Sequence, residues 1–574
     1  MDIMKEYNAW LHDFADDAAT RAELEAIRDN PAEIEDRFYT NLSFGTAGMR
    51  GVLGAGTNRM NIYNVRRAAA GFADYLLDAD PNSRTRGVVI AYDSRRMSDR
   101  FAEETALIFC ARGIAAHLFD ALRPVPVLSF AVRHLNAAAG VVITASHNPP
   151  EYNGFKVYGE DGAQLSPEAA AQVTSRIAAL RYQDCVPMPR QEALDKGLLH
   201  LIGNAEVDDD YIRMVLSLAV RPDLLKAEGK NLRIVYTPLH GSGNVPVRRV
   251  LAEASIENVT VVPEQEHPDP DFSTVSAPNP ENPDAFSLAI PLARKVGASV
   301  IFGTDPDCDR LGVCVQDADG VFRTLTGNQI GCLLLHHILT GRKASGTLPE
   351  NGACIKSIVT TELARAISAS FGVEQFDVLT GFKFVGELIQ QFEETGSHEF
   401  LFGFEESFGY LSGTQVRDKD GVNASLLIAE AACVCLHEGI TLYDRLQQIF
   451  RDYGWYAEQV LSKTLPGKDG LADMRAIMER LRANPPDAIG GVAVTAVRDY
   501  LAGTRIADGR QEALNTPPSN VLYYELAGGH WLCVRPSGTE PKIKVYVNTR
   551  SDESMADAEA LCARLTEAGE AMLA

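Results

Sequence analysis

The stretch ASVIFGTDPDCDR, residues 298–310, joins the pattern of a buried strand to an acidic loop. Its first part is a continuous apolar run, which is typical of a strand covered on both faces in a parallel or mixed sheet. Its second part places Asp305, Asp307 and Asp309 on alternate positions. In open α/β sheets, the loops beyond the carboxyl ends of the strands carry the functional groups. The stretch therefore predicts an α/β fold with a site at the end of a buried strand.

The same pattern recurs along the chain. Four other apolar runs lead into polar or glycine-rich loops: GVVIAYDSR (87–95), AAGVVITASHNPP (138–150), LRIVYTPLHGSG (232–243) and EFLFGFEES (399–407). Amphipathic stretches between them, such as SDRFAEETALIFCARG (98–113), are typical of helices. The first forty residues also predict helices with charged faces. Near the C-terminus, residues 523–549 alternate like antiparallel strands around one loop.

The chain length indicates several domains, because 574 residues exceed the usual size of a domain built around one hydrophobic core. We expect an α/β protein with three similar mixed-sheet α/β domains and a smaller α+β C-terminal domain around a central cleft. The expected domains are residues 1–205, 206–321, 322–455 and 456–574. In that order they would contain the loops at 144–158, 305–310, 403–410 and 535–546.

Composition and charge exclude several classes of function. A net charge of -23 argues against binding to duplex nucleic acid or to an anionic membrane surface. An anionic metabolite remains possible, since a few arginines and lysines can reverse the field inside one cleft. The ten cysteines are scattered without a zinc or disulfide pattern. The acidic N-terminal segment lacks the features of a signal peptide, and no long apolar run predicts a membrane span. We therefore expect a cytoplasmic protein.

The acidic loop DPDCDR, residues 305–310, predicts a divalent metal site. Alternate spacing turns Asp305, Asp307 and Asp309 toward one point, where their charges repel unless a cation lies between them. An EF-hand is excluded, because its sixth and twelfth positions hold Arg310 and Gln316 in place of glycine and glutamate. Mg²⁺ is preferred if the ligand is a phosphate. The alternative is a solvated acidic turn.

A second loop, TASHNPPEYNGFKVY (144–158), places Ser146 beside His147 with Lys156 further along. The serine could be a nucleophile or a phosphate carrier, but a helix N-cap followed by a proline turn would look the same. No Gly-x-Ser-x-Gly motif surrounds this serine, which disfavours a hydrolase.

Two further loops suit sugar and phosphate groups. In GFEESFGY (403–410), Glu405 and Ser407 could bind sugar hydroxyls, although an ordinary helix cap is equally plausible. In RPSGTEPKIKVY (535–546), a guanidinium, two hydroxyls and a permissive backbone could bind an anion, and a plain hairpin turn is the alternative. The candidate phosphate ligands are Arg535, Ser537, Gly538 and Thr539.

Two nucleotide-binding motifs are missing from the sequence. No G-x-x-x-x-G-K-[ST] motif occurs, and the glycine-rich segments GAGTNR (54–59) and GSGNVP (241–246) do not complete a dinucleotide fingerprint. A transferred phosphoryl group would therefore come from a source other than ATP, and a resident phosphoserine could supply it.

Taken in order, these loops resemble the α-D-phosphohexomutase superfamily, which contains phosphoglucomutases and phosphomannomutases. The resemblance extends from FGTAGMRG (44–51) to RPSGTEPKIK (535–544). The motifs TASHNP (144–149), GFKFVG (381–386) and FGFEES (402–407) place the chain near the long phosphoglucomutases, a branch that also contains phosphopentomutases and glucose-1,6-bisphosphate synthases.

The resemblance implies a role for each matching residue. Ser146 would be the phosphorylated serine, and Asp305, Asp307 and Asp309 would bind Mg²⁺ together with its phosphate. The basic residues near the transferring phosphoryl would be Arg50, His147 and Lys156, and Arg310 would be a phosphate-facing arginine beside the metal that binds the substrate. Glu405 and Ser407 would bind the sugar, Gly381 and Lys383 would form a specificity loop, and the loop at 535–539 would bind the distal phosphate. Cys308 stands where a smaller residue is commoner.

The activity implied is the interconversion of glucose 1-phosphate and glucose 6-phosphate through glucose 1,6-bisphosphate, which also serves as activator. Mannose phosphates are possible further substrates. The alternatives are a phosphopentomutase, a glucose-1,6-bisphosphate synthase and a non-catalytic sugar-phosphate sensor, whereas Asp309-Arg310 fits a haloacid-dehalogenase-like phosphatase poorly. Either His147 or Lys156 would accept the hydroxyl proton. The expected partners are sugar phosphates alone, with no nucleic acid or membrane, for a monomer or homodimer.

Overall fold

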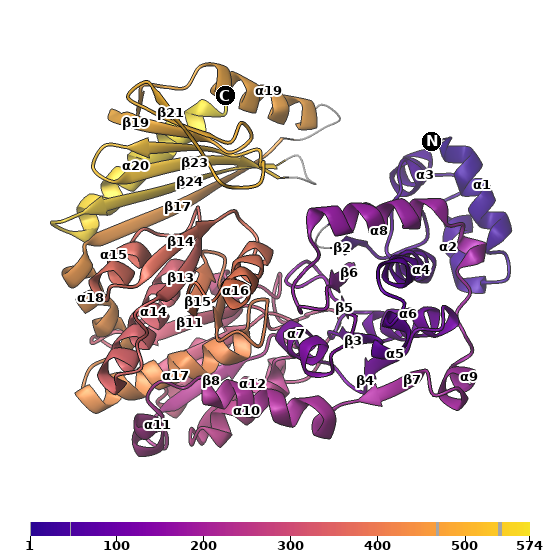
Figure 1. Ribbon diagram of the computed structural model, residues 1–574, viewed down its shortest axis with the longest axis horizontal. Coiled ribbons are helices and arrows are strands. Elements are labelled where there is room, and N and C mark those ends of the chain that lie inside the picture. The colour runs from indigo at the N-terminus through magenta and orange to yellow at the C-terminus, as the bar shows by residue number, and fades with distance from the viewer. Residues whose placement is uncertain (1, 46–47, 466–469, 538–541) are drawn as a thin grey trace.

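The computed structural model describes residues 2–45, 48–465, 470–537 and 542–574. Within these ranges the strands form four main sheets, each with its own helices (Figure 1). The N-terminal domain lies on the right of the figure, and the strand-rich C-terminal domain lies at the upper left. The predicted fold class is confirmed, with three mixed-sheet α/β domains followed by a sheet-rich domain. The residue borders between the domains stay a prediction.

The sheet of the N-terminal domain has the order β1-β2-β6-β5-β3-β4-β7. Strands β5, β3, β4 and β7 run parallel, and β6 and β2 extend the sheet antiparallel. The apolar runs VVIA and AGVVI are fully buried because helices cover both faces of the sheet. The strands are β1 (Phe44–Gly45), β2 (Gly48–Val52), β3 (Val88–Tyr92), β4 (Ala116–Phe119), β5 (Ala139–Ile143), β6 (Tyr152–Tyr158) and β7 (Leu199–Ile202).

The helices predicted in the first forty residues are present. Their apolar sides form a separate small core in which Trp10 and Phe38 pack with Tyr63 of α4. The helices of this domain are α1 (Ile3–Asp13), α2 (Ala18–Ala26), α3 (Pro31–Phe38), α4 (Ile62–Ala79), α5 (Ser83–Arg86), α6 (Ser98–Ala111), α7 (Val125–His134), α8 (Pro167–Ala179) and α9 (Arg190–Asp195).

The second domain repeats the same mixed arrangement in the order β12-β11-β10-β8-β9. Strands β8, β9 and β10 are parallel, and β11 returns antiparallel to β10, so the acidic loop lies between β10 and β11. The strands are β8 (Arg233–Thr237), β9 (Asn258–Val261), β10 (Val300–Thr304), β11 (Leu311–Gln316) and β12 (Phe322–Thr324). The helices are α10 (Asp209–Ser217), α11 (Pro222–Glu228), α12 (Asn244–Glu253) and α13 (Ala289–Val296).

The third domain has the smallest of the four main sheets, with the strand order β14-β13-β15-β16 and one antiparallel edge strand, β16. One large apolar core joins it to the second domain and to part of the first. The strands are β13 (Gly352–Ser357), β14 (Glu374–Val378), β15 (Glu399–Glu405) and β16 (Gly409–Ser412). The helices are α14 (Gly327–Ser345), α15 (Leu363–Ser370), α16 (Lys383–Thr395), α17 (Gly421–Glu438) and α18 (Leu442–Tyr453).

The C-terminal domain is an antiparallel sheet in the order β17-β24-β23-β22-β19-β20-β21, with β18 paired to β19. The predicted strand pair around one loop corresponds to β23 and β24. Helix α20 packs on one face of this sheet, and Ile358 and Leu379 of the third domain pack on the other. The elements are β17 (Trp455–Thr464), α19 (Gly470–Ala483), β18 (Ala488–Ile489), β19 (Val492–Asp499), β20 (Thr504–Ala507), β21 (Arg510–Ala513), β22 (Leu522–Leu526), β23 (His530–Pro536), β24 (Lys542–Ser551) and α20 (Met555–Met572).

Helix α17 is long and apolar enough to cross a membrane by length and composition, but 78% of it is buried inside the protein. Its N-cap residue is Asp420, whose carboxylate accepts hydrogen bonds from the backbone N–H groups of Val422 (3.0 Å) and Asn423 (2.9 Å). The hydroxyl of Tyr211 donates to the same carboxylate at 2.8 Å. Burial raises the pKa of Asp420 to about 6 despite these hydrogen bonds.

The raised pKa of Asp420 predicts a pH-dependent cost in stability. The folded state holds this proton more tightly than the unfolded chain, so the free energy of unfolding decreases as the pH rises from about 4 to about 6. Asp420→Asn removes this pH-dependent contribution to stability and keeps a side-chain oxygen that can accept the capping hydrogen bonds. Between pH 5 and pH 8, urea unfolding should show the variant gaining roughly 1 kcal/mol relative to the wild type. Asp2→Asn, at the exposed cap of α1, is the control. An unchanged difference across this pH range would contradict the prediction.

Candidate active site

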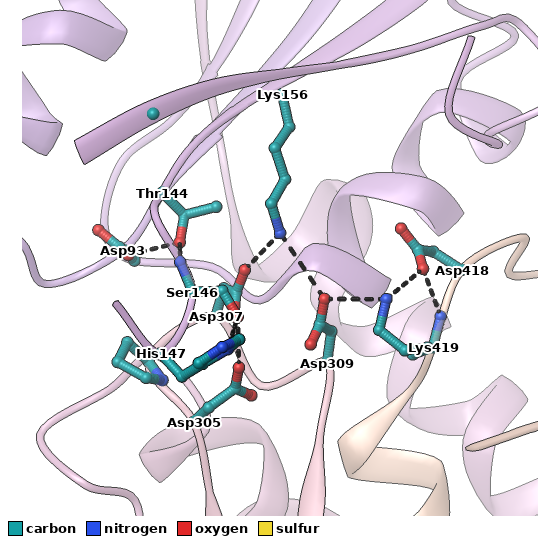
Figure 2. Close-up of polar contacts among 12 residues, drawn as sticks. Asp93, Thr144, Ser146, His147, Lys156, Asp305, Asp307, Asp309, Asp418 and Lys419 are labelled. Carbon is teal, nitrogen blue, oxygen red and sulfur yellow. Dashed lines mark hydrogen bonds and ion pairs between the residues drawn. The ribbon is translucent and has the colours of Figure 1, made fainter. Parts of the chain in front are cut away.

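Ser146 lies in the loop between β5 and β6, just beyond the carboxyl end of a buried parallel strand. Its φ of 52° places the residue in the left-handed region, which non-glycine residues seldom adopt. Its backbone N–H donates to Thr144 Oγ1 at 2.8 Å, and Thr144 Oγ1 donates to Asp93 Oδ2 at 2.6 Å. This conformation turns the Ser146 hydroxyl toward the acidic loop of the second domain, where it donates to Asp305 Oδ2 at 2.7 Å (Figure 2).

The acidic loop brings its carboxylates together as predicted. Ligand oxygens of Asp305, Asp307 and Asp309 lie within 4.8 Å of one another, and all three side chains are buried. The loop is held by its backbone: Ser242 Oγ donates to the carbonyl of Pro306 at 2.7 Å, and Val125 N–H donates to the carbonyl of Asp307 at 2.9 Å.

These carboxylates fit a divalent cation. Among the described residues, neither Asp307 Oδ1 nor Asp309 Oδ1 has a hydrogen-bond partner, although Arg310 Nε lies 3.8 Å from Asp309 Oδ1. A buried anionic oxygen without a hydrogen bond is costly. Burial and repulsion from Asp307 and Asp309 raise the pKa of Asp305 well above its usual value. Burial acts in the same direction on Asp307, but attraction from Lys156 and Lys419 and hydrogen bonds with Lys156 and Asp305 together lower the pKa of that carboxyl. A bound divalent cation would relieve this repulsion and satisfy both free oxygens.

Lys156 and Lys419 surround the carboxylates with positive charge. Lys156 Nζ, on β6, is 2.8 Å from Asp307 Oδ2 and 3.7 Å from Asp309 Oδ2. Lys419 Nζ, on the loop before α17, is 3.2 Å from Asp309 Oδ2 and 3.0 Å from Asp418 Oδ1 (Figure 2). Burial opposes the charge on Lys419, but the attractions of Asp309, Asp418 and Glu405 together raise its pKa. Side chains from three domains therefore meet within one cluster.

The imidazole of His147 lies beside Ser146 in the same cluster. Its Nδ1 lies 3.2 Å from Ser146 Oγ. Burial, followed by repulsion from Arg310 and Arg50, lowers the pKa of His147 well below its usual value. Arg310 donates its backbone N–H to Asp305 Oδ1 at 3.0 Å and forms an ion pair with Glu281.

Arg50 lies at the rim of the cluster, on β2. Its guanidinium donates to Asn148 Oδ1 at 2.9 Å, two residues beyond Ser146. The three basic residues predicted for the transferring phosphoryl, and Arg310 predicted beside the metal, thus all lie around the Ser146 loop and the acidic loop.

The predicted sugar-binding pair follows β15. Burial raises the pKa of Glu405 to about 7, although Lys419 opposes this shift. Ser407 lines a cavity of about 380 Å³ together with Glu406, Lys544 and Tyr546, so the third and C-terminal domains form this space jointly.

The predicted specificity loop lies at the start of α16. Gly381 has a φ of 117°, which favours glycine at this position. The ammonium of Lys383 is 4.8 Å from the centre of the Phe384 ring, and burial lowers the pKa of this lysine. The Lys383 ammonium therefore contacts an aromatic ring outside the carboxylate cluster.

The predicted phosphate loop lies between β23 and β24. Arg535 and Ser537 line a cavity of about 220 Å³ with Lys542 and Lys544. Ser537 N–H donates to the carbonyl of Lys542 at 2.7 Å, which closes the base of the loop. The other two predicted ligands, Gly538 and Thr539, lie outside the described residues. The described part of the loop is therefore a concentration of positive charge in an acidic chain.

Sequence reasoning missed Asp418 and Lys419. Tyr158 OH donates to Asp418 Oδ2 at 3.0 Å, and this carboxylate in turn holds Lys419. The signal in the sequence was the charged segment RDKD (417–420) directly before the apolar helix α17. Asp418 and Lys419 are both buried, and charged side chains are seldom buried without partners, so a charged segment at this position indicates paired charges.

Family models match nearly the whole length of the chain. The models for phosphoglucomutase/phosphomannomutase alpha/beta/alpha domains I, II and III match residues 41–184, 209–320 and 326–453, and the C-terminal domain model matches residues 474–565. The chain belongs to the phosphoglucomutase/phosphomannomutase family. Members of this family are phosphotransferases of the isomerase class, so the protein is an enzyme of that class.

Named relatives agree with this placement. A phosphoglucomutase from Staphylococcus haemolyticus is 39% identical over 521 residues, which cover 90% of this chain and 92% of the relative. The open form of Paramecium pp63/parafusin, a phosphoglucomutase, superposes with a TM-score of 0.67 at 17% identity, covering 92% of this chain and 96% of that one. An N-acetylphosphoglucosamine mutase from Aspergillus fumigatus, solved with GlcNAc-6P and magnesium, superposes with a TM-score of 0.50 at 13% identity. The match covers 93% of this chain and 97% of that one. The two structures show the fold alone.

Proposed function

We propose that this protein is a phosphoglucomutase that interconverts glucose 1-phosphate and glucose 6-phosphate through a phosphorylated Ser146. The observation that carries the proposal is the 2.7 Å hydrogen bond from Ser146 Oγ to Asp305 Oδ2, which joins a serine of one domain to the carboxylate cluster of another. A phosphoryl group on this oxygen would sit against the carboxylate cluster and next to Lys156 and His147. The 39% identity to a phosphoglucomutase supports glucose as the sugar.

In the first half of the reaction, the 6-hydroxyl oxygen of glucose 1-phosphate attacks the phosphorus of phospho-Ser146. The new O–P bond forms as the bond from phosphorus to Ser146 Oγ breaks, and the product is glucose 1,6-bisphosphate. The intermediate then turns over within the site. In the second half, Ser146 Oγ attacks the 1-phosphoryl group, and glucose 6-phosphate leaves.

The structure supports His147 as the acceptor of the hydroxyl proton. A base must be neutral before it accepts a proton, and the surroundings of His147 favour its neutral form. The ammonium of Lys156, in contrast, already forms ion pairs with Asp307 and Asp309. In this proposal, Lys156 and Lys419 balance negative charge on the phosphoryl group as it transfers, and their ion pairs with the acidic loop support this role.

The buried carboxylates would hold Mg²⁺ through Asp305, Asp307 and Asp309, with a Ser146 phosphate oxygen as a further ligand. When bound, the ion would supply charge stabilisation to the phosphoryl oxygens. In this proposal, Glu405 and Ser407 bind the sugar hydroxyls, Gly381 and Lys383 form the specificity loop, and Arg535 and Ser537 bind the non-reacting phosphate. The cavities lined by Ser407 and by Arg535 with Ser537 support these roles. Sugar phosphates are therefore the substrates, and we propose a cytoplasmic location and glucose 1,6-bisphosphate as activator. The oligomeric state, monomer or homodimer, stays a prediction.

A substrate panel tests the proposal directly. The purified protein is incubated with Mg²⁺, a trace of glucose 1,6-bisphosphate and, separately, glucose, mannose or ribose 1-phosphate. We expect fast conversion of glucose 1-phosphate, slower conversion of mannose 1-phosphate and little conversion of ribose 1-phosphate. Conversion of ribose 1-phosphate alone would identify a phosphopentomutase, and release of the bisphosphate as the main product would identify a synthase. No conversion of any sugar, with unphosphorylated Ser146, would favour a non-catalytic sensor.

A further inference from the structure

A buried arginine lies beneath the loop that carries Ser146. Arg95 follows β3 and is only 3% exposed. Its Nη1 donates to the backbone carbonyls of Pro149 at 2.9 Å and Tyr152 at 3.1 Å, and its Nη2 donates to those of Ser146 and Asn148. The two terminal nitrogens of a guanidinium carry four N–H groups, so all four are used on one short loop.

The neighbouring carboxylate holds the other side of the same loop. Asp93 Oδ1 accepts hydrogen bonds from the backbone N–H of Arg95 at 3.0 Å and from Ser98 Oγ at 2.7 Å. Asp93 Oδ2 accepts from Thr144 Oγ1, which itself accepts the backbone N–H of Ser146. Both backbone polar groups of Ser146 are therefore tied to residues 93–95, one through Thr144 and one directly.

This network explains how Ser146 keeps an unfavourable backbone conformation. A serine with a φ of 52° costs on the order of 1 kcal/mol and persists only when its surroundings hold it there. The same conformation directs Ser146 Oγ at Asp305 Oδ2. Without the hydrogen bonds to its carbonyl and N–H, the residue would relax toward a commoner conformation, and its hydroxyl would leave the carboxylate cluster.

The arginine is also held from the second domain. The ring of Phe272 covers the face of the Arg95 guanidinium, with 4.9 Å between the ring centre and Cζ. Phe272 is 1% exposed, and the neighbouring pair Arg96 and Asp271 forms an ion pair across the same boundary. Stacking on an aromatic face fixes the plane of a guanidinium while leaving its edge free for hydrogen bonds. The contact therefore ties the orientation of the Ser146 loop to the domain that carries the acidic loop.

We propose that Arg95 is a positioning residue for phosphoryl transfer, which holds the backbone of residues 146–152 so that Ser146 Oγ faces the acidic loop, and that Phe272 sets the plane of its guanidinium. The inference rests on the proposed phosphoserine mechanism. Lysine cannot replace the arginine, because a single ammonium nitrogen cannot reach four carbonyls spread along seven residues.

The experiment compares the wild type with Arg95→Lys, Arg95→Ala and a matched control, Arg86→Lys. Arg86 also donates to backbone carbonyls, those of Asn136 and Ala137, but it lies at the opposite end of β3. For each protein, kcat and KM for glucose 1-phosphate are measured. The rate of Ser146 phosphorylation by glucose 1,6-bisphosphate is followed by intact mass spectrometry. Turnover of glucose 1-phosphate by the wild type tests the proposed phosphoserine mechanism. An inactive wild type would contradict that mechanism, whereas an active wild type with equally active Arg95 variants would contradict the role of Arg95.

We expect both Arg95 variants to lose about 100-fold in kcat and in the rate of Ser146 phosphorylation, the penalty of a misplaced reacting group. KM should change by less than about threefold, since the phosphate loop at Arg535 is untouched. Methylguanidinium added to Arg95→Ala should restore part of kcat, and it should not accelerate the wild type or Arg86→Lys. A loss of stability alone would lower the fraction of active protein and leave the phosphorylation rate per active site unchanged.

A milder variant covers the case in which the Arg95 variants do not fold. Phe272→Leu keeps an apolar side chain at the site and removes the aromatic face. We expect a loss of about tenfold in kcat. Phe109→Leu, an equally buried phenylalanine on α6, should retain the wild-type kcat. The proposal is overturned if Arg95→Lys keeps kcat within about threefold of the wild type, or if Phe272→Leu and Phe109→Leu behave alike.

Discussion

Replacement of Ser146 by alanine should lower mutase activity by about 10⁴-fold or more, because no other group can carry the phosphoryl between the two hydroxyls of the sugar. In the structure, Ser146 Oγ donates a hydrogen bond to Asp305 Oδ2 and lies 3.2 Å from His147 Nδ1. Alanine removes the oxygen without filling new space, so the loop held by Arg95 should keep its conformation. Turnover of glucose 1-phosphate in the presence of glucose 1,6-bisphosphate is the measurement, with mass spectrometry to detect phosphorylation.

Ser166→Ala is the matched control for this prediction. Ser166 caps α8 in the same domain, and its Oγ accepts the backbone N–H of Ala169 at 3.2 Å. Its loss should cost about 1 kcal/mol in stability and leave kcat unchanged. Substantial turnover by Ser146→Ala, or phosphorylation of another residue in that variant, would overturn the assignment of Ser146.

Asp307→Asn should remove both metal binding and activity. The amide keeps the shape of the side chain but loses the charge that attracts a cation and that pairs with Lys156 at 2.8 Å. We expect Mg²⁺ affinity, measured by isothermal titration calorimetry, to fall by more than about 100-fold, since changes around a ligand alone cost 10- to 100-fold. Activity measured against Mg²⁺ concentration should decrease in parallel.

An exposed aspartate of the same domain provides the comparison. Asp319 lies in the turn between β11 and β12, and Asp319→Asn changes the net charge by the same amount. This variant should retain wild-type Mg²⁺ affinity and activity. If Asp307→Asn bound Mg²⁺ as tightly as Asp319→Asn, the carboxylate cluster would not be the functional metal site.

Much of the active site could be predicted because its residues are grouped in short loops. The alternation of Asp305, Asp307 and Asp309 is a local property, and three carboxylates this close in sequence can converge without help from the rest of the chain. Ser146 and His147 are likewise neighbours in one loop. In each case the apolar run before the loop indicates a buried strand, and the carboxyl end of such a strand is where functional groups gather.

Other parts of the site depend on contacts between distant segments. Lys419 reaches Asp309 only because the third domain packs against the second, and 110 residues of chain separate them. Arg95 reaches Ser146 through the pairing of β3 with β5, and Phe272 reaches Arg95 across a domain boundary. An isolated buried lysine or arginine in a sequence has no pattern that identifies its partners.

The sequence by itself determined the class of fold, the positions of the serine and acidic loops, and the family. These properties follow from local patterns: continuous apolar runs indicate buried strands, and the side chains that follow each run indicate its chemistry. The tertiary structure alone decided which loops meet, which lysines pair with the carboxylates, and that the pKa of His147 is lowered while that of Lys419 is raised. The physical reason is that burial and electrostatic interaction depend on distances through space, and those distances are set by the order of strands in the sheets and by the packing of one domain on another.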